Sequence, residues 1–319
     1  MDILDNESVE PSIIEVKPTP KPLWIELFWL SVCVLLGLFL AQFLGLLAVL
    51  PFFDYRIDLF QEALASPFSG GAKIPLLIIQ AITQVIGFVI APFVFFRLVE
   101  KKELFQIPVD KNIQFYMPIL VAFIMIVIMP ANAWLIELNR NLQFPSWMAG
   151  FENWAMAKEK ELEQLTLALT DLRTAGEIFL GIIVFALIPA IGEEWLFRGV
   201  LQRKLIERNI NPHVAIIVTG IIFSAIHLQF YGFLPRMVLG ILLGYLFWWT
   251  GNLTFSIIAH FVNNAFTLIL IILRNLEFIS LDIENTISVP IEVALGSLVS
   301  FAGLTAIFWI CRKNNYTIL

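Results

Sequence analysis

The sequence predicts an all-α membrane protein with about eight transmembrane helices. Of its 319 residues, 59% are hydrophobic and only 14% are charged, whereas a soluble domain carries roughly 25% charged residues. The apolar residues gather in long runs, each near the ~20 residues that a helix needs to span a bilayer. Most of these runs lack the two-residue alternation of barrel strands, so helices are favoured over a β-barrel.

The apolar runs define the expected elements in order. The predicted spans lie roughly at 24–50, 74–97, 115–137, 177–197, 212–230, 233–250, 253–274 and 288–311. Residues 51–73 are predicted to form a loop, and 98–112 a basic connection. In the long segment 138–176, leucines at helical spacing predict one further helix. That helix lies either in the membrane interface or against the protein's own outer surface.

The two ends of the chain are expected on the same side, because the number of spans is even. The first 22 residues hold five acidic residues and four prolines, which predicts a disordered tail ahead of a single helical domain at 23–319. Of the 20 Lys and Arg residues, twelve lie on the side of the two ends and eight on the other. Because positive loops stay inside, both termini are predicted to be cytoplasmic.

Charged residues at the end of the fourth run are the first functional signal. Such charges are costly at membrane depth and usually face a partner or a cavity. Neighbouring residues on a helix point about 100° apart, so Glu193 and Glu194 serve different faces. Arg198 follows Glu194 by four residues, which is the favourable spacing for an ion pair. This leaves Glu193 as the uncompensated carboxylate and a candidate general base.

His227 lies deep in the next apolar run, at a matching height. The segment Asn209–Pro212 is a strong turn signal, and Glu193 and His227 each lie 17 residues from residue 210 at its centre. In a straight helical hairpin both would stand about 25 Å above the turn. We therefore expect the two side chains to be level with each other.

His260 and Asn264 lie four residues apart, so they share one helix face, while Asn263 is expected to point elsewhere. His260 follows the turn at 250–252 by about 12 Å of helix. Glu193 is expected about 25 Å above its own turn and His260 about 12 Å above the turn at 250–252. For the two to meet, the hairpin that carries Glu193 and His227 must project about 13 Å beyond the membrane surface at the turn 250–252. The predicted site then lies inside the bilayer, nearer the cytoplasmic face.

Two features of the sixth run carry weaker signals. Gly240 and Gly244 have the GxxxG spacing that lets membrane helices approach closely. Arg236, near the start of the run, fits an anchoring role at the membrane interface.

Three motifs together resemble a known family. They are Glu-Glu-x-x-x-Arg at 193–198, Phe-x-x-x-His at 223–227 and His-x-x-x-Asn at 260–264. In this order they are similar to the intramembrane CAAX-processing and bacteriocin-processing proteases, the Rce1-like or Abi (CPBP) family. The resemblance covers roughly 177–266, and the amino-terminal half carries no matching motif.

The resemblance implies an intramembrane endopeptidase whose cavity opens to the cytosol, with its catalytic core at about 177–275. Its substrate would be a membrane-associated or lipidated protein or peptide, and its location the plasma membrane. Glu193 would activate water with His227, and His260 and Asn264 would polarise the carbonyl and stabilise the oxyanion. The implied catalytic residues are Glu193, His227, His260 and Asn264, supported by Glu194, Arg198 and Phe223.

A metal-dependent mechanism is the open alternative. Glu193, His227 and His260 could supply the three protein ligands of a catalytic zinc or another divalent ion. However, the chain has no HExxH motif. In addition, Glu194 would have to leave its ion pair to act as the base. We therefore prefer a mechanism without a metal cofactor.

Two other functions remain alternatives. A catalytically idle scaffold or immunity protein could use the same fold with an intact site. An ion-coupled transporter is less favoured, because the amino-terminal half has almost no buried charge and no internal repeat is visible. Nothing indicates a nucleic-acid partner. The substrate and the oligomeric state stay open.

Overall fold

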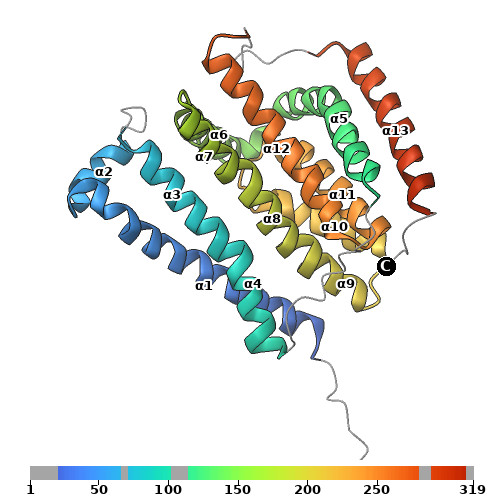
Figure 1. The fold of residues 1–319 in the computed structure, drawn as a ribbon, viewed down its shortest axis with the longest axis horizontal. Helices are drawn as coiled ribbons and strands as arrows, with labels where there is room; N and C mark the ends of the chain where they lie inside the picture. The colour runs from blue at the N-terminus through green and yellow to red at the C-terminus, as the bar shows by residue number, and fades with distance from the viewer. Residues whose placement is uncertain (1–20, 66–70, 102–113, 280–288, 314–319) are drawn as a thin grey trace, which may run out of the picture.

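The computed structural model describes residues 21–65, 71–101, 114–279 and 289–313. These residues form helices and turns, with no β-strand among them (Figure 1). The elements are α1 (Leu23–Val49), η1 (Leu50–Phe53), α2 (Ile57–Ala65), α3 (Lys73–Gln84), η3 (Val85–Ile90), α4 (Ala91–Val94), η4 (Phe95–Glu100), α5 (Tyr116–Arg140), η5 (Ser146–Met148), α6 (Ala149–Leu169), α7 (Ala175–Ile182), η6 (Ile183–Leu187), α8 (Ile188–Glu194), η7 (Trp195–Gln202), α9 (Arg203–Glu207), α10 (Pro212–Ala225), α11 (Phe233–Thr250), α12 (Leu253–Asn275) and α13 (Ile291–Lys313).

Seven helical segments of the described chain are long and apolar enough to cross a membrane by length and composition. The predicted all-α polytopic membrane fold is therefore confirmed. The expected span at 212–230 is the exception, because α10 has only 14 residues. At 1.5 Å per residue it is about 21 Å long, short of a hydrocarbon core of ~30 Å.

Two further expectations concern the amino-terminal part. The predicted loop at 51–73 contains a nine-residue helix, α2. The predicted disordered tail lies outside the described residues, apart from Lys21 and Pro22.

Local capping signals explain where the helices around the turns begin and end. Asn211 caps α10 by accepting a hydrogen bond from the His213 backbone, just ahead of Pro212 in the first turn. Asn252 caps α12 in the same way. Between them, α11 ends at Gly251, whose φ of 62° is the left-handed conformation that favours glycine. These signals fix the short connection between α11 and α12.

One end of the bundle, here called the terminal face, holds the start of α1 and the ends of η4, α9, α11 and α13. Lys204 in α9 contacts Glu26 at 3.3 Å and Glu100 at 3.0 Å, and Arg208 also pairs with Glu26. Arg312 near the end of α13 donates to the Trp249 carbonyl beside the end of α11. The two described ends of the chain therefore lie on one face.

The opposite end, here called the α6 face, gathers the starts of α3 and α7 and the ends of α5 and α12. Lys73 at the start of α3 contacts Glu177 in α7 at 2.8 Å. Asn275 at the end of α12 donates to the Thr170 carbonyl at 2.9 Å. Figure 1 shows the end of α12 and the starts of α3 and α7 together, away from the start of α1.

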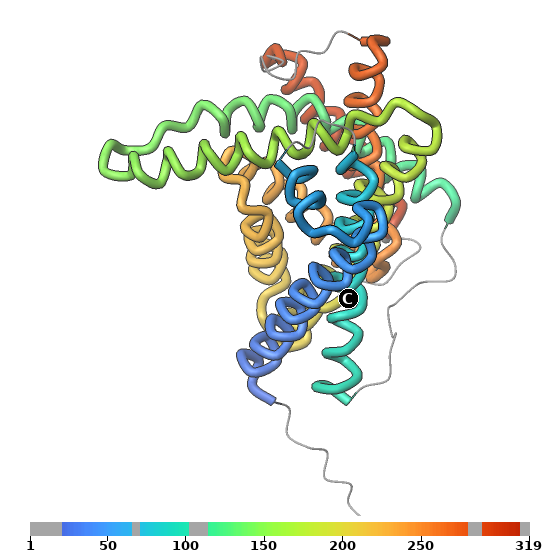
Figure 2. Tube along the Cα trace, turned by 90° about the vertical axis from the view of Figure 1, so that its left-hand side faces the viewer, coloured from blue at the N-terminus to red at the C-terminus, as the bar shows by residue number. Residues whose placement is uncertain are grey.

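The helix expected in segment 138–176 is α6, and it crosses the α6 face. Figure 2 shows α5 and α6 as a pair that projects sideways from the other helices. The pair is tied to the connection between α10 and α11, because Asn139 donates to the Phe230 carbonyl at 3.1 Å. The Phe144 and Phe230 rings pack with centroids 4.7 Å apart. Since α6 also exposes Trp154 and Met156, it both docks on the protein and presents apolar side chains outward.

The two GxxxG glycines bring α11 close to its neighbours. A Cβ at Gly240 would lie 3.1 Å from the Gly220 Cα in α10, and one at Gly244 would lie 2.7 Å from the Gln202 Oε1. A larger residue at either position would force its neighbours to shift, so the glycines favour this close approach, as the spacing predicts. It also exposes two carbonyls: Arg198 donates to that of Gly240 at 2.7 Å, and Gln202 to that of Gly244 at 2.9 Å.

Candidate active site

The two glutamates lie on α8, between two π-helical segments, η6 and η7. Such segments are rare and often occur at functional sites, because they shift the direction of the side chains that follow. Glu193 is 8% exposed and Glu194 is fully buried. The straight hairpin assumed from the sequence is therefore only an approximation on this side.

Glu194 and Arg198 form the ion pair that their spacing predicts. Arg198 Nη1 donates to Glu194 Oε1 at 2.6 Å, and both side chains are 0% exposed. The guanidinium also lies 4.9 Å above the centroid of the Phe223 ring. With the Gly240 carbonyl, Arg198 is thus held by a carboxylate, a carbonyl and an aromatic face, which offset much of its burial, while its Nε has no hydrogen-bond partner among the described residues.

His260 lies between the two glutamates. Its Nδ1 is 2.8 Å from Glu194 Oε1, and its Nε2 is 3.9 Å from Glu193 Oε2. Because an ionised carboxylate only accepts hydrogen bonds, Nδ1 carries the proton and donates a hydrogen bond to Glu194. The distance to Glu193 is too long for a direct hydrogen bond but suits a bridging water.

His227 follows the last turn of α10, beside Phe223. Its Nδ1 lies 2.7 Å from the Phe223 carbonyl, so Nδ1 is the donor and Nε2 is left available. The Phe223 ring packs edge-on against His227 at 5.2 Å and against His260 at 5.9 Å between centroids. The Phe-x-x-x-His spacing therefore lets one phenyl ring position both imidazoles.

Asn264 occupies the next turn of α12 after His260. Its Nδ2 donates to the Phe185 carbonyl at 3.2 Å, and its Oδ1 accepts from Asn263 at 3.0 Å. An amide nitrogen has two N–H groups, so one remains for another acceptor. Asn263, which was expected to point elsewhere, lies beside Asn264 and orients it.

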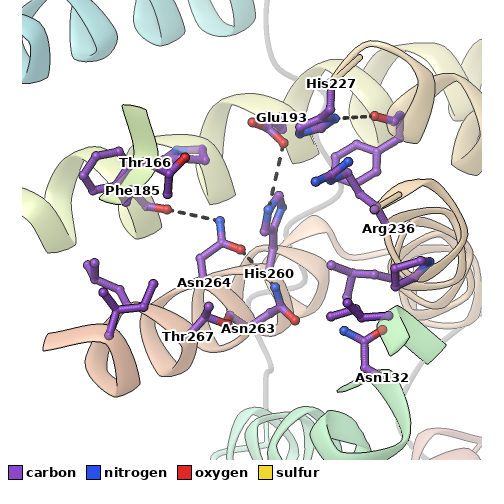
Figure 3. Close-up of a pocket in the computed structure, with 18 of the residues that line it drawn as sticks. Asn132, Thr166, Phe185, Glu193, His227, Arg236, His260, Asn263, Asn264 and Thr267 are labelled. Carbon is purple, nitrogen blue, oxygen red and sulfur yellow. Dashed lines mark hydrogen bonds and ion pairs between the residues drawn. The ribbon is translucent and has the colours of Figure 1, made fainter. Parts of the chain in front are cut away.

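One cavity of about 500 Å³ brings the four implied catalytic residues together. Figure 3 shows Glu193, His227, His260 and Asn264 around the same space, on three different elements. The other lining residues include Gln84, Asn132, Arg140, Glu159, Thr166, Thr170, Phe185, Phe223, Tyr231, Arg236, Asn263 and Thr267. The expectation that Glu193 and His227 face one site agrees with this arrangement.

The cavity extends toward the α6 face. Glu193 and His260 lie deepest, while Arg140, Thr166 and Thr170 line the cavity at that face. On the other side of Glu193, the residues of η7 from Trp195 to Val200 are all buried. The described ends of the chain lie on the terminal face. Along the described residues, the cavity lining therefore leads away from the face that holds the chain ends.

Arg236 is the main functional candidate that sequence reasoning missed. It was interpreted as an interfacial anchor, but it lines the cavity (Figure 3). Its Nη2 donates to Gln229 at 2.6 Å, while its buried Nη1 has no hydrogen-bond partner among the described residues. The sequence did contain a signal for this role: Arg236 follows a short apolar run closely.

Glu159 on α6 was also missed as a site residue. It lines the cavity, and its buried Oε2 has no hydrogen-bond partner among the described residues. Burial raises the pKa of this carboxyl, while the Tyr231 backbone N–H and Arg236 pull it in the opposite direction. The carboxyl at the mouth of the cavity is thus easier to protonate than an exposed glutamate.

The implied metal ligands do not form an obvious metal centre. Within the described ranges, no cluster of three or more His, Cys, Asp or Glu side chains could hold an ion. His227 Nδ1 is engaged with a carbonyl, and His260 Nδ1 with Glu194. Both rings leave Nε2 available, which is compatible with a metal ligand, but the described side chains do not gather into a three-ligand site, so no step below runs through a metal.

Comparisons with known proteins agree with the location of this site. Residues 175–266 match the family model described as type II CAAX prenyl endopeptidase Rce1-like. Over 88 residues the chain is 35% identical to the uncharacterized protein YpbD of Bacillus subtilis (strain 168). This match spans 26% of the chain and 42% of the length of YpbD. No solved structure matches the chain. Residues 175–266, which run from α7 into α12 and include the whole segment from Glu193 to Asn264, therefore form a domain of the Rce1-like family.

Proposed function

We propose that this membrane protein is an intramembrane endopeptidase that hydrolyses a peptide bond with Glu193 as the general base. The observation that carries the proposal is the pairing within the site. Glu194 Oε1 is held by both Arg198 and His260, and its Oε2 is buried away from partners among the described residues, whereas Glu193 faces the cavity and His260 Nε2 at 3.9 Å. The family domain at 175–266 supports protease chemistry.

The proposed reaction begins with a water molecule that donates one hydrogen bond to Glu193 Oε2 and the other to His227 Nε2. Glu193 takes a proton as the water oxygen attacks the scissile carbonyl carbon. The carbonyl oxygen becomes an oxyanion. Glu193 then returns the proton to the amine nitrogen as the C–N bond breaks. His227, through its available Nε2, assists by accepting a hydrogen bond from the same water.

The oxyanion needs hydrogen-bond donors, and three side chains of the site are candidates. Asn264 retains an N–H beyond the one bonded to Phe185. His260 can donate from Nε2 only as the imidazolium, because Nδ1 already donates to Glu194. Arg236 Nη1 is a third donor, buried and without a described partner. Donors fixed before reaction stabilise such charge by several kcal/mol in typical enzymes, on the order of 3 kcal/mol each.

The substrate class follows from the membrane setting. The protein is an integral membrane protein, so the scissile segment belongs to a peptide or protein at the bilayer, lipidated or not. We place the enzyme in the plasma membrane. The preference for a mechanism without zinc or another divalent ion stays part of the proposal.

The test is a cleavage assay on the purified full chain. Lipidated and unlipidated membrane peptides are incubated with the parent, Glu193→Ala and Glu194→Ala, each with and without a chelator. We expect Glu193→Ala to be inactive and folded, whereas Glu194→Ala also loses stability because it strands Arg198. Chelator should leave the parent unchanged.

Three results would count against the proposal. Equal turnover by Glu193→Ala and the parent would remove the general base. Loss of parent activity with chelator, restored by zinc, would replace the metal-free mechanism. A parent that cleaves no peptide under any condition would favour the idle scaffold.

A further inference from the structure

We infer that the substrate reaches the site from the α6 face and that this face lies outside the cytoplasm, so that the enzyme acts on exported protein segments. The inference rests on the proposed function for the identity of the reaction. It goes beyond that function by naming the side of entry and the substrate class.

The cavity runs deep from the α6 face and stops short of the terminal face. Glu193 lies 14 residues before Glu207, the last residue of α9 at the terminal face. The intervening η7 side chains are buried almost throughout. In contrast, Thr267 and Ile271 continue the lining along α12 toward the α6 face. Water and peptide therefore have a lined route on one side and a packed segment on the other.

A charge network closes the terminal face near the helical segment that carries Glu193. Lys204 is 5% exposed and contacts both Glu26 and Glu100. Its ammonium also lies 5.2 Å from the Phe95 ring centroid. The network joins α1, η4 and α9, so opening a path there would strand buried charges, which is strongly unfavourable.

The positively charged residues are distributed unevenly between the two sides of the molecule. Counted along the sequence, twelve of the 20 Lys and Arg residues fall on the side of the chain ends and eight on the other; one of the twelve, Arg198, is buried in the site. Four of those eight lie in the long segment 138–176, and one, Arg236, lines the cavity. Because orientation follows the positive residues of short loops, the terminal face is cytoplasmic. The α6 face is then extracytoplasmic.

The lining at the α6 face indicates what enters. Thr166, Thr170, Tyr231 and Arg140 line that part of the cavity with hydroxyl and guanidinium groups. Such groups suit the backbone amides of an extended polypeptide. The substrate class is accordingly a membrane-proximal polypeptide segment on the outer side, in place of a cytosolic lipidated tail.

Thiol labelling tests this inference without requiring turnover. Cys33 and Cys311 are the two cysteines of the sequence, so both are first replaced by Ala in the full-length protein. Single cysteines are then introduced in the cavity (Thr267→Cys), on α6 (Glu161→Cys) and on the terminal face (Glu207→Cys). The Glu161 and Glu207 side chains are 66% and 48% exposed. A membrane-impermeant sulfonated maleimide is applied to intact cells and to inverted membrane vesicles.

We expect intact cells to be labelled at Thr267→Cys and Glu161→Cys, and inverted vesicles at Glu207→Cys alone. Labelling of Glu207→Cys in intact cells would overturn the orientation. Labelling of Thr267→Cys from the side of Glu207→Cys, or from neither side, would overturn entry at the α6 face. Because the reagent reports access only, these failures are distinct from an inactive Glu193.

Discussion

Glu193 and Glu194 are neighbours in the chain but have opposite roles in the site. Glu194 is enclosed by Arg198 and His260, and its carboxylate holds the His260 ring by Nδ1. Glu193 lies across the same ring from the other nitrogen. A single histidine therefore links the structural carboxylate to the proposed base.

The first prediction concerns the buried ion pair. Arg198→Met should lower the free energy of unfolding by about 3–5 kcal/mol, because it strands Glu194 without a counter-charge. The double variant Glu194→Gln/Arg198→Met should recover much of that loss. Thermal unfolding in detergent measures both, and a double variant no more stable than Arg198→Met would contradict the pairing.

The second prediction concerns Arg236. If its free Nη1 binds the peptide, Arg236→Gln should lower kcat/KM by about 10- to 100-fold, the value of a hydrogen bond to a charged group. Arg236→Lys should restore part of the loss. The matched control is Arg203→Gln, an exposed arginine of the terminal face. Equal kcat/KM for Arg236→Gln and the control would exclude Arg236 from substrate binding.

Some residue-level features follow from spacing, and others depend on packing. The four-residue interval between Glu194 and Arg198 predicts their ion pair, and the intervals within 223–227 and 260–264 identify side chains that do share one cavity. Arg236 could not be assigned to the site from the sequence. It reaches the cavity because α10 ends early, at Ala225, so that the start of α11 lies beside the cavity. Asn263 was not assigned to the site, because the side chain that it bonds is that of Asn264, the next residue in the sequence.

At the level of elements, α10 and α11 pack through glycine. Gly240→Ala should cost about 1–3 kcal/mol, as is typical of overpacking a close contact. Gly303→Ala in α13 is the matched control, because a Cβ there meets nothing within 4 Å. Thermal unfolding of the two variants checks this, and equal stability would contradict the close approach at Gly240.

The docking of α6 should depend on pH through Glu159. Since burial raises the pKa of its carboxyl in the folded state, any stability from the protonated form is lost as the pH rises through that raised pKa. Glu159→Gln should therefore match the parent near pH 4 and unfold at a higher temperature than the parent near pH 8. A difference in melting temperature that stays constant with pH would contradict the shift.

Helix existence was more predictable than helix shape. Apolar length alone located the spans, because a bilayer imposes that length. The π-helical segments around α8 were not predictable, since they depend on how η6 and η7 pack against α12 and α10. The position of α6 was also left open, because its leucines could face either lipid or protein.

For the whole molecule, the all-α membrane fold follows from composition, but the direction of the cavity does not. Charge counting predicts which face is cytoplasmic, and the family resemblance implied a cytosolic opening. In the structure, the cavity lining leads toward one face and the described chain ends lie on the opposite face. The face that charge counting predicts to be cytoplasmic is therefore not the face toward which the cavity leads. Only the three-dimensional arrangement of α6 over the short α10–α11 hairpin reveals this.

The most direct test of the account is the turnover number of Glu193→Gln on a cleaved peptide. This variant keeps the size of the side chain and removes only its basicity. General-base catalysis typically contributes 10²–10⁴-fold, so kcat should fall by about that factor at unchanged melting temperature. Glu62→Gln, in the short helix α2, should keep the parent kcat. A Glu193→Gln variant that is folded and as fast as Glu62→Gln would contradict the central claim.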